Sequence, residues 1–150
     1  MSDGVRSREQ RKADTLAILG AAEADVWVAS ASEDGPYLVP LSLAWVGERA
    51  VLALEASSRT ARNIVERGTA RLGAGRTRDV VMIDAVLERS VPVGEGGQIA
   101  EGYAAQADWD PRDAGAGYVY LVLRPDRIQA WRESNEQTGR LLMRDGTWLV

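Results

Sequence analysis

The chain has 150 residues, a net charge of −4 and neither histidine nor cysteine. The missing imidazoles and thiols exclude Ser-His-Asp and Cys-His nucleophiles, thiolate zinc sites and disulfides. The acidic balance argues against a general nucleic-acid surface, and no apolar run approaches the roughly 20 residues of a membrane span. We therefore expect one domain, residues 1–150, with a full hydrophobic core and no metal site.

The first half of the chain predicts two helices and three strands. The charged N-terminal segment, residues 1–12, is followed by no signal-peptide core, so we expect a cytoplasmic protein. Glu33-Asp34-Gly35 is typical of a tight hairpin turn, and Gly68 is placed to end a helix. The predicted elements are helices at 5–24 and 58–66 and strands at 26–32, 37–46 and 49–55.

The second half predicts more strands around one further helix. Residues 124–127 contain Pro125 and indicate a turn or bulge between two β-rich runs. The predicted elements are strands at 69–75, 79–88, 118–123 and 128–131, a helix at 97–108 and a hairpin at 141–150. Short strands at close spacing indicate an α+β protein that is mainly β, an antiparallel barrel with a few helices at its rim.

Residues 57–63 combine two hydroxyl side chains with two arginines at the start of the second predicted helix. Cations are unfavourable there, because the first turn carries the positive end of the helix dipole and unpaired N–H groups. A bound phosphate would satisfy the amides, Ser57, Ser58 and the guanidinium groups of Arg59 and Arg62 together. The segment is therefore a candidate anion site; the alternative is a surface helix in which Arg62 pairs with Glu66.

Pro40 interrupts a predicted strand shortly before this candidate site. Proline removes a hydrogen bond from the strand ladder, so it belongs at a sheet edge, at a bulge or beside a ligand. In the last case, backbone groups of Val39, Leu41 and Ser42 would be free to contact a polar ring.

These residues, taken in order, resemble a known family. Segments 34–42, 52–54, 57–63 and 78–83 follow the order strand, turn, strand, turn, strand, phosphate helix. In this they resemble the flavin-binding split barrels related to pyridoxamine 5'-phosphate oxidase, over roughly residues 15–90. The resemblance implies a split β-barrel of the FMN-binding type and a homodimer with FMN bound in two grooves at the interface.

The resemblance also assigns residues to the cofactor. Ser58, Arg59 and Thr60 match phosphate-binding positions, with Arg62 and Asn63 close by, and Val39, Pro40 and Leu41 match the strand along the flavin ring. The remaining matches are Ala53 and Leu54 on the strand leading to the helix, Asp79 where better-known members carry Gln, and Trp131 as the aromatic that closes the partner's flavin site.

The C-terminal part departs from a vitamin B6 oxidase. Residues 140–144 only loosely resemble the substrate segment of that enzyme, and Leu142 stands at the position of its histidine. Pyridoxamine phosphate is thus not the expected substrate. The related deazaflavin branch binds F420 in much the same groove, so F420 is the alternative cofactor.

A flavin supplies its own redox chemistry, which suits a chain without histidine and cysteine. The leading hypothesis is an FMN- or F420-dependent oxidoreductase acting on a small molecule that the sequence does not identify. The alternative is a carrier or sensor that binds the flavin without catalysis.

Overall fold

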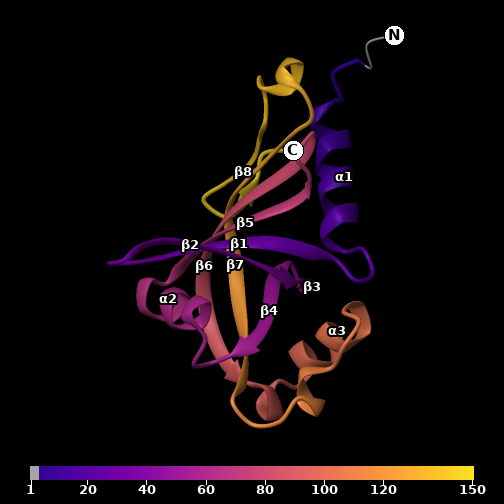
Figure 1. Cartoon of the computed structure of the whole chain (residues 1–150). Helices are drawn as coiled ribbons and strands as arrows, with labels where there is room; N and C mark the ends of the chain where they lie inside the picture. The colour runs from indigo at the N-terminus through magenta and orange to yellow at the C-terminus, as the bar shows by residue number, and fades with distance from the viewer. Residues whose placement is uncertain (1–3) are drawn as a thin grey trace.

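A computed structural model describes residues 4–150 and shows a nine-stranded antiparallel sheet that curls around a hydrophobic interior, with three helices at its rim (Figure 1). The first three residues of the predicted charged N-terminal segment lie outside the described residues. The helices are α1 (Arg8–Leu19), α2 (Arg59–Arg67) and α3 (Gln98–Gln106). The strands are β1 (Asp25–Ser32), β2 (Gly35–Ser42), β3 (Ala44–Val46), β4 (Arg49–Glu55), β5 (Thr69–Arg76), β6 (Asp79–Pro92), β7 (Tyr118–Trp131), β8 (Leu141–Arg144) and β9 (Thr147–Trp148).

The main path of the sheet runs β2-β1-β5-β6-β7-β4-β3, and β8 pairs with β7 and β9 beside this path. Alternate residues of β1 point to opposite faces, as the pleat of a strand requires. Val26, Val28 and Ser30 are buried, whereas Trp27 on the other face is 54% exposed. The predicted α+β split barrel is therefore confirmed as an antiparallel sheet with one buried concave face.

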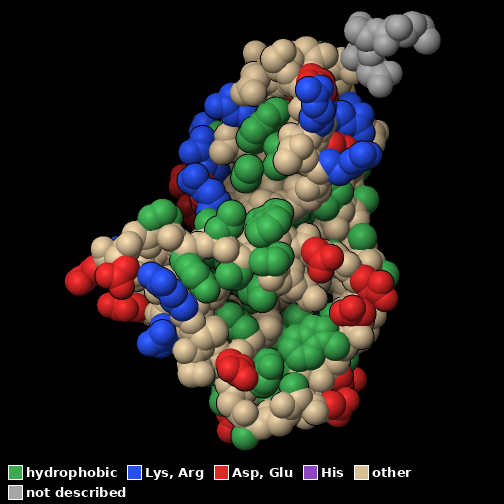
Figure 2. Space-filling view, viewed as in Figure 1, with side chains coloured by type: hydrophobic (Ala, Val, Ile, Leu, Met, Phe, Trp, Pro, Cys, Tyr) green, Lys and Arg blue, Asp and Glu red, His purple; other side chains and the backbone are tan. Residues whose placement is uncertain are grey.

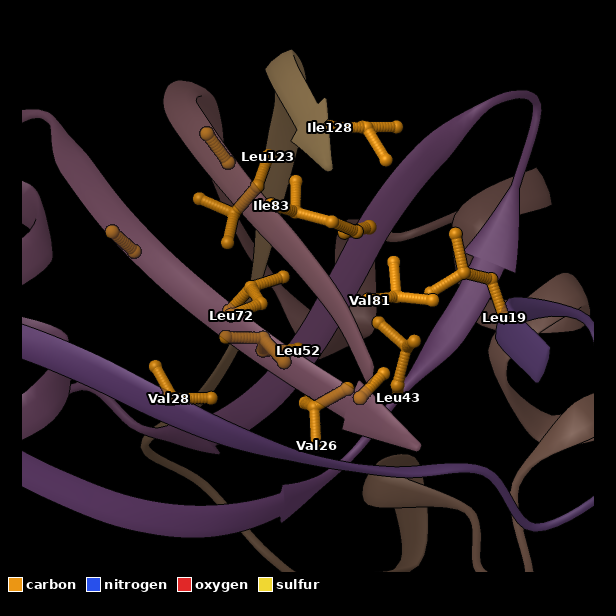
Figure 3. Packing of buried hydrophobic residues seen from close by; sticks show 14 of the residues in the cluster. Leu19, Val26, Val28, Leu43, Leu52, Leu72, Val81, Ile83, Leu123 and Ile128 are labelled. Atoms are coloured by element: carbon orange, nitrogen blue, oxygen red, sulfur yellow. The ribbon is translucent and has the colours of Figure 1, made fainter. Parts of the chain in front are cut away.

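Two groups of apolar side chains hold the fold together. The larger group fills the barrel interior, where Leu52, Leu72, Ile83 and Leu123 are fully buried (Figure 3). The smaller group lies between α3 and the outer side of β3, β4 and β7, and its centre is the buried pair Tyr103 and Tyr120. Burial of this apolar surface is the main favourable term for folding.

Four predicted elements have different boundaries in the structure. The predicted strand 37–46 is broken at Leu43, whose N–H donates to the carbonyl of Ala24 (2.8 Å), so that the chain turns from β2 into β3. The predicted strands 118–123 and 128–131 form one strand, β7, because Asp126 is accommodated as a bulge opposite Asp84 and Ala85. The predicted helix 5–24 is shorter: Ser7 caps α1 and Gly20 ends it.

Gly75 is a backbone position at which the fold requires glycine. Its φ is +79°, and a Cβ there would collide with the backbone carbonyl oxygen of Asp79 across the β5–β6 turn. Gly47 has a similar φ of +55° but nothing within 4 Å of the Cβ position. We expect Gly75→Ala to lower the free energy of unfolding by about 2–3 kcal/mol and Gly47→Ala by only about 1 kcal/mol, measured by urea denaturation. Equal losses would contradict a steric role for Gly75.

Candidate functional site

The barrel has an open seam between β2 and the second half of β4. Within residues 4–150, β2 is the last strand of the sheet and pairs only with β1. β3 pairs with residues 49–51 of β4, so residues 52–55 have a strand neighbour only on the β7 side. β2 contacts β4 although no ladder joins them. We call this junction, bounded by residues 37–42 and 52–55, the seam; it ends where the chain enters α2.

Pro40 lies on the edge strand, opposite Trp27 of β1. The edge interpretation of this proline is therefore confirmed, and the unpaired side of β2 belongs to the seam. The side chains of Val39 and Leu41 are partly buried and pack on the barrel interior, as does Leu54 from the other side of the seam. Ala53 points to the opposite face of β4, in the cluster under α3, so the structure separates it from these three side chains.

Helix α2 begins at the end of the seam with a capped first turn. The Oγ atom of Ser58 accepts the N–H of Ala61 at 3.2 Å, and the left-handed Gly68 ends the helix as predicted. Because Ser58 acts only as an acceptor in this cap, its hydroxyl proton is free for another acceptor. Ser57, immediately before it, is exposed.

The two arginines of the candidate anion site both reach the surface. Arg59 is 43% exposed, its guanidinium carbon lies 4.8 Å from the ring centre of Tyr37, and Nη2 lies 4.0 Å from Oδ2 of Asp34. Arg62 is exposed one turn later, and within residues 4–150 no ion pair joins it to Glu66. The alternative of a surface helix stabilised by an Arg62–Glu66 pair is thus not what the structure contains. Sequence reasoning missed Tyr37 and Asp34, because neither has a spacing that signals contact with Arg59.

Thr60 and Asn63 face the interior. Both are at most 5% exposed, and Nδ2 of Asn63 donates to Oγ of Ser30 on β1 at 3.2 Å. These side chains anchor α2 to the sheet. Of the candidate anion site, the structure therefore brings Ser57, Ser58, Arg59 and Arg62 to the surface at the seam and places Thr60 and Asn63 beneath the helix.

At the other end of β2, Ser42 adjoins the buried Tyr103 of α3. Burial raises the pKa of Tyr103 to about 12, while Trp109 and Ser42 act in the opposite direction. This phenol is therefore neutral at physiological pH. Hydrophobic side chains gather on the face between the β1–β2 hairpin, α2 and α3 (Figure 2), which makes the surroundings of the seam largely apolar.

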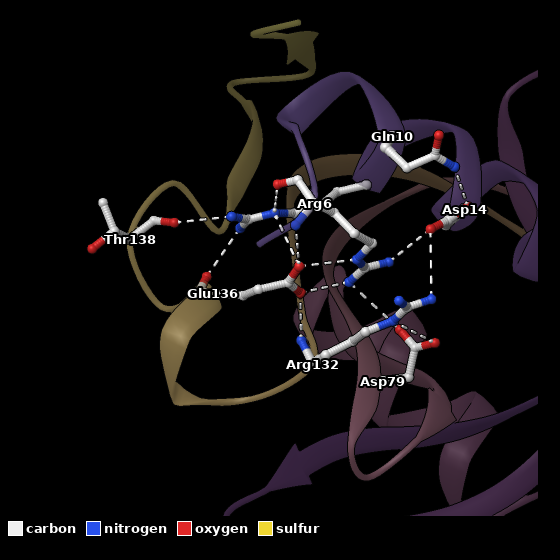
Figure 4. A network of polar contacts seen from close by, with 8 residues as sticks. Arg6, Gln10, Asp14, Asp79, Arg132, Glu136 and Thr138 are labelled. Carbon is white, nitrogen blue, oxygen red and sulfur yellow. Dashed lines mark hydrogen bonds and ion pairs between the residues drawn. The ribbon is translucent and has the colours of Figure 1, made fainter. Parts of the chain in front are cut away.

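Asp79 and Trp131 lie away from the seam, where β5, β6 and the end of β7 meet the N-terminal segment. Asp79 is within 3.6 Å of Arg6 and 3.3 Å of Arg132 (Figure 4). Trp131 pairs with Val80 across the ladder, and the guanidinium of Arg140 lies 5.9 Å from its ring. The structure does not bring these two residues to the seam of their own chain, and the predicted role of Trp131 at a partner's flavin site stays a prediction.

The polar network around Asp79 is centred on Glu136, which sequence reasoning did not identify. Its carboxylate accepts from Arg6 at 2.7 Å and from the backbone N–H of Arg132 at 2.8 Å. The guanidinium of Arg6 holds the pKa of Glu136 down at about 2 and also lowers that of Asp14. The network joins residues 6–14 to the loop after β7. Because Arg6 and Glu136 lie 130 residues apart, no local sequence pattern predicts their contact.

The sequence matches no protein-family model and no curated protein. No helix in residues 4–150 is long and apolar enough to cross a membrane. Several solved structures nevertheless resemble this chain. An F420 reductase superposes with a TM-score of 0.60 and 20% identity, over 75% of this chain and 94% of that one.

Two further structures show how widely the fold is shared. A putative pyridoxamine 5'-phosphate oxidase from Listeria innocua has a TM-score of 0.62 and 15% identity, over 83% of this chain and 98% of its own. A heme binding protein from Mycobacterium smegmatis has a TM-score of 0.63 and 19% identity, over 96% of this chain and 60% of its own. The chain therefore has the split-barrel fold of the pyridoxamine 5'-phosphate oxidase-like proteins, as its sequence indicated.

Proposed function

We propose that the chain binds FMN in the seam, with the phosphate at Ser57, Ser58, Arg59 and Arg62 and the ring along residues 39–42. The observation that carries this proposal is the convergence of a free strand edge and two exposed arginines at one helix start. The helix dipole disfavours an arginine near its positive end, and the attraction of a bound phosphate offsets this unfavourable electrostatic energy.

The residues present fit a phosphorylated flavin. The ion pair between Arg59 and Asp34 is long, at 4.0 Å, and exposed, so it is weak. A phosphate that binds the Arg59 guanidinium therefore loses little free energy by replacing Asp34. Val39, Leu41 and Leu54 offer apolar contact, and the unpaired backbone edge of β2 offers donors and acceptors to polar ring atoms. A bound flavin would supply hydride or electron transfer, so the protein's part is to bind and orient it and to limit water around it.

The test is a titration of the purified protein with FMN and, separately, with F420, followed by visible absorption and fluorescence. We expect saturable binding of FMN at micromolar or lower concentration. A protein that binds neither cofactor would overturn the proposal. If the protein is an oxidoreductase rather than a carrier, some small-molecule acceptor will reoxidise the reduced complex faster than oxygen alone.

We also propose that two copies of the chain associate through the outer face of β1, β2, β5 and β6. Trp27 and Leu38 are 54% and 59% exposed there, side by side on paired strands. With Met82 and Gly73 they line a mostly apolar hollow of about 290 Å³. Exposed apolar side chains grouped around an apolar hollow on one face support an association site there.

Charge placed on this face is expected to separate the dimer. Leu38→Asp should convert a dimer into a monomer at micromolar concentration, because association would bury the new carboxylate. Val65→Asp is the matched control, since Val65 is 53% exposed on α2, away from this face. Sedimentation velocity measures both variants. A wild-type monomer, or a Leu38→Asp dimer as stable as the wild type, would contradict the proposed interface.

A further inference from the structure

The end of the β1–β2 hairpin adds negative charge beyond the proposed phosphate position. Asp34 is 88% exposed and lies beside Arg59, and the neighbouring Glu33 is also exposed. Acidic atoms gather at the far left end of the hairpin in Figure 2, next to basic atoms over α2. We call Glu33 and Asp34 the acidic tip.

The direction of β2 places this tip in line with the proposed cofactor. From Leu41 to Tyr37 the strand covers about 13 Å, at roughly 3.3 Å per residue, and leads from the proposed ring position toward the tip. Arg59 sits over the ring of Tyr37, near the tip end of the strand. A group that continued past the phosphate along this line would next meet Asp34 and Glu33.

FMN and F420 differ at that point. FMN ends in its phosphate, whereas the phosphate of F420 is a diester that continues into a chain of glutamates. Arg59 and Arg62 are the two cations at this end of α2, and one of them already faces Asp34. Further carboxylates placed beside the acidic tip would be repelled by it, whereas the charge of a terminal phosphate lies at Arg59 and Arg62, which compensate it.

We propose that the acidic tip makes the site select a flavin with a terminal phosphate over a cofactor whose phosphate carries an anionic extension. This inference rests on the proposed cofactor site and assigns it a specificity element. Tyr37 contributes by holding Arg59 at the tip end of the seam, between the phosphate position and Asp34.

The test compares Kd values of FMN and of F420 with several glutamates, for the wild type and for Glu33→Gln/Asp34→Asn. Asparagine suits a turn before glycine, so the hairpin is kept. We expect the wild type to bind FMN more tightly. At about 10 mM salt the variant should improve F420 affinity about three- to ten-fold and FMN affinity by less, and the gain should shrink at about 0.5 M salt as the charges are screened.

Glu23→Gln/Asp108→Asn is the control, because it removes two negative charges from exposed residues at the opposite end of β1. The backbone N–H of Glu23 donates there to the carbonyl of Gln106, at the end of α3. This control should leave the ratio of the two Kd values unchanged. Wild-type affinity for F420 that equals or exceeds that for FMN, or an unchanged ratio in the tip variant, overturns this inference alone. Failure of the wild type to bind either cofactor overturns the proposed function and this inference with it.

Discussion

Replacing Glu136 with glutamine is expected to lower the free energy of unfolding by about 3 kcal/mol, the lower end of the cost of removing one partner from a buried ion pair, because Arg6 keeps Asp14 at 2.9 Å. Glu136 is 2% exposed and binds Arg6 through the side chain and the backbone. The variant removes one of the three carboxylates that face Arg6, the third being that of Asp79 at 3.6 Å, and it also removes the negative charge 3.9 Å from the buried Arg11. Urea denaturation at neutral pH measures the loss.

Glu133→Gln is the matched control for this prediction. Glu133 also pairs with an arginine, Arg78 at 3.1 Å, but both side chains are more than half exposed. Exposed pairs contribute at most about 1 kcal/mol, so this variant should remain close to the wild type. An equal decrease in the free energy of unfolding in the two variants would show that the buried Glu136 pair stabilises the fold no more than the exposed Glu133 pair.

The same network gives stability a defined dependence on pH. The pKa of Glu136 is lowered from 4.5 to about 2 in the folded chain, so its ionised form favours folding. This contribution is complete above the unfolded pKa near 4.5 and is lost as the pH falls from there toward 2. Glu136→Gln should show a correspondingly smaller fall in stability across this range, and a curve parallel to the wild type would contradict the assignment.

Removal of both arginines from the start of α2 is the second large effect that we expect. Arg59→Ala/Arg62→Ala should weaken FMN binding by roughly 10- to 100-fold, the loss of about 1.5–3 kcal/mol of charge-assisted hydrogen bonding. Binding of riboflavin, which lacks the phosphate, should change by less than about twofold in the same variant. Fluorescence titration measures both, and an unchanged far-ultraviolet circular dichroism spectrum confirms that the fold is kept.

Arg67→Ala supplies the control, because Arg67 is an exposed arginine in the last turn of the same helix. It removes one unit of positive charge from α2 without touching the helix start. Its FMN affinity should stay within about twofold of the wild type. If riboflavin and FMN lose affinity equally in the double variant, the phosphate does not bind at this helix start.

Local patterns in the sequence predicted the elements that local chemistry determines. The predicted helix at 58–66, ended by Gly68, matches α2 to within one residue, and Glu33-Asp34-Gly35 placed the β1–β2 hairpin correctly. The position of Pro40 on an edge strand is one of the three that its missing N–H allows. These features depend on a few neighbouring residues, so they are visible without the fold.

Features that depend on tertiary contacts were not predictable in this way. Leu43 breaks a continuous β pattern because its N–H meets the carbonyl of Ala24 on a distant segment. Asn63 lies on the buried face of α2, and Asp79 is enclosed by Arg6 and Arg132, contacts that no spacing in the sequence indicates. The strands and the helix start of the site were therefore predictable, whereas the direction of individual side chains was not.

The most direct test of the proposed function is a crystal structure of the protein grown with FMN. We expect the phosphate within hydrogen-bond distance of the Arg59 guanidinium and the Ser58 hydroxyl, with the ring along residues 39–42. FMN bound elsewhere, such as at the arginine-rich β5–β6 turn, or with its phosphate away from the start of α2, would contradict it.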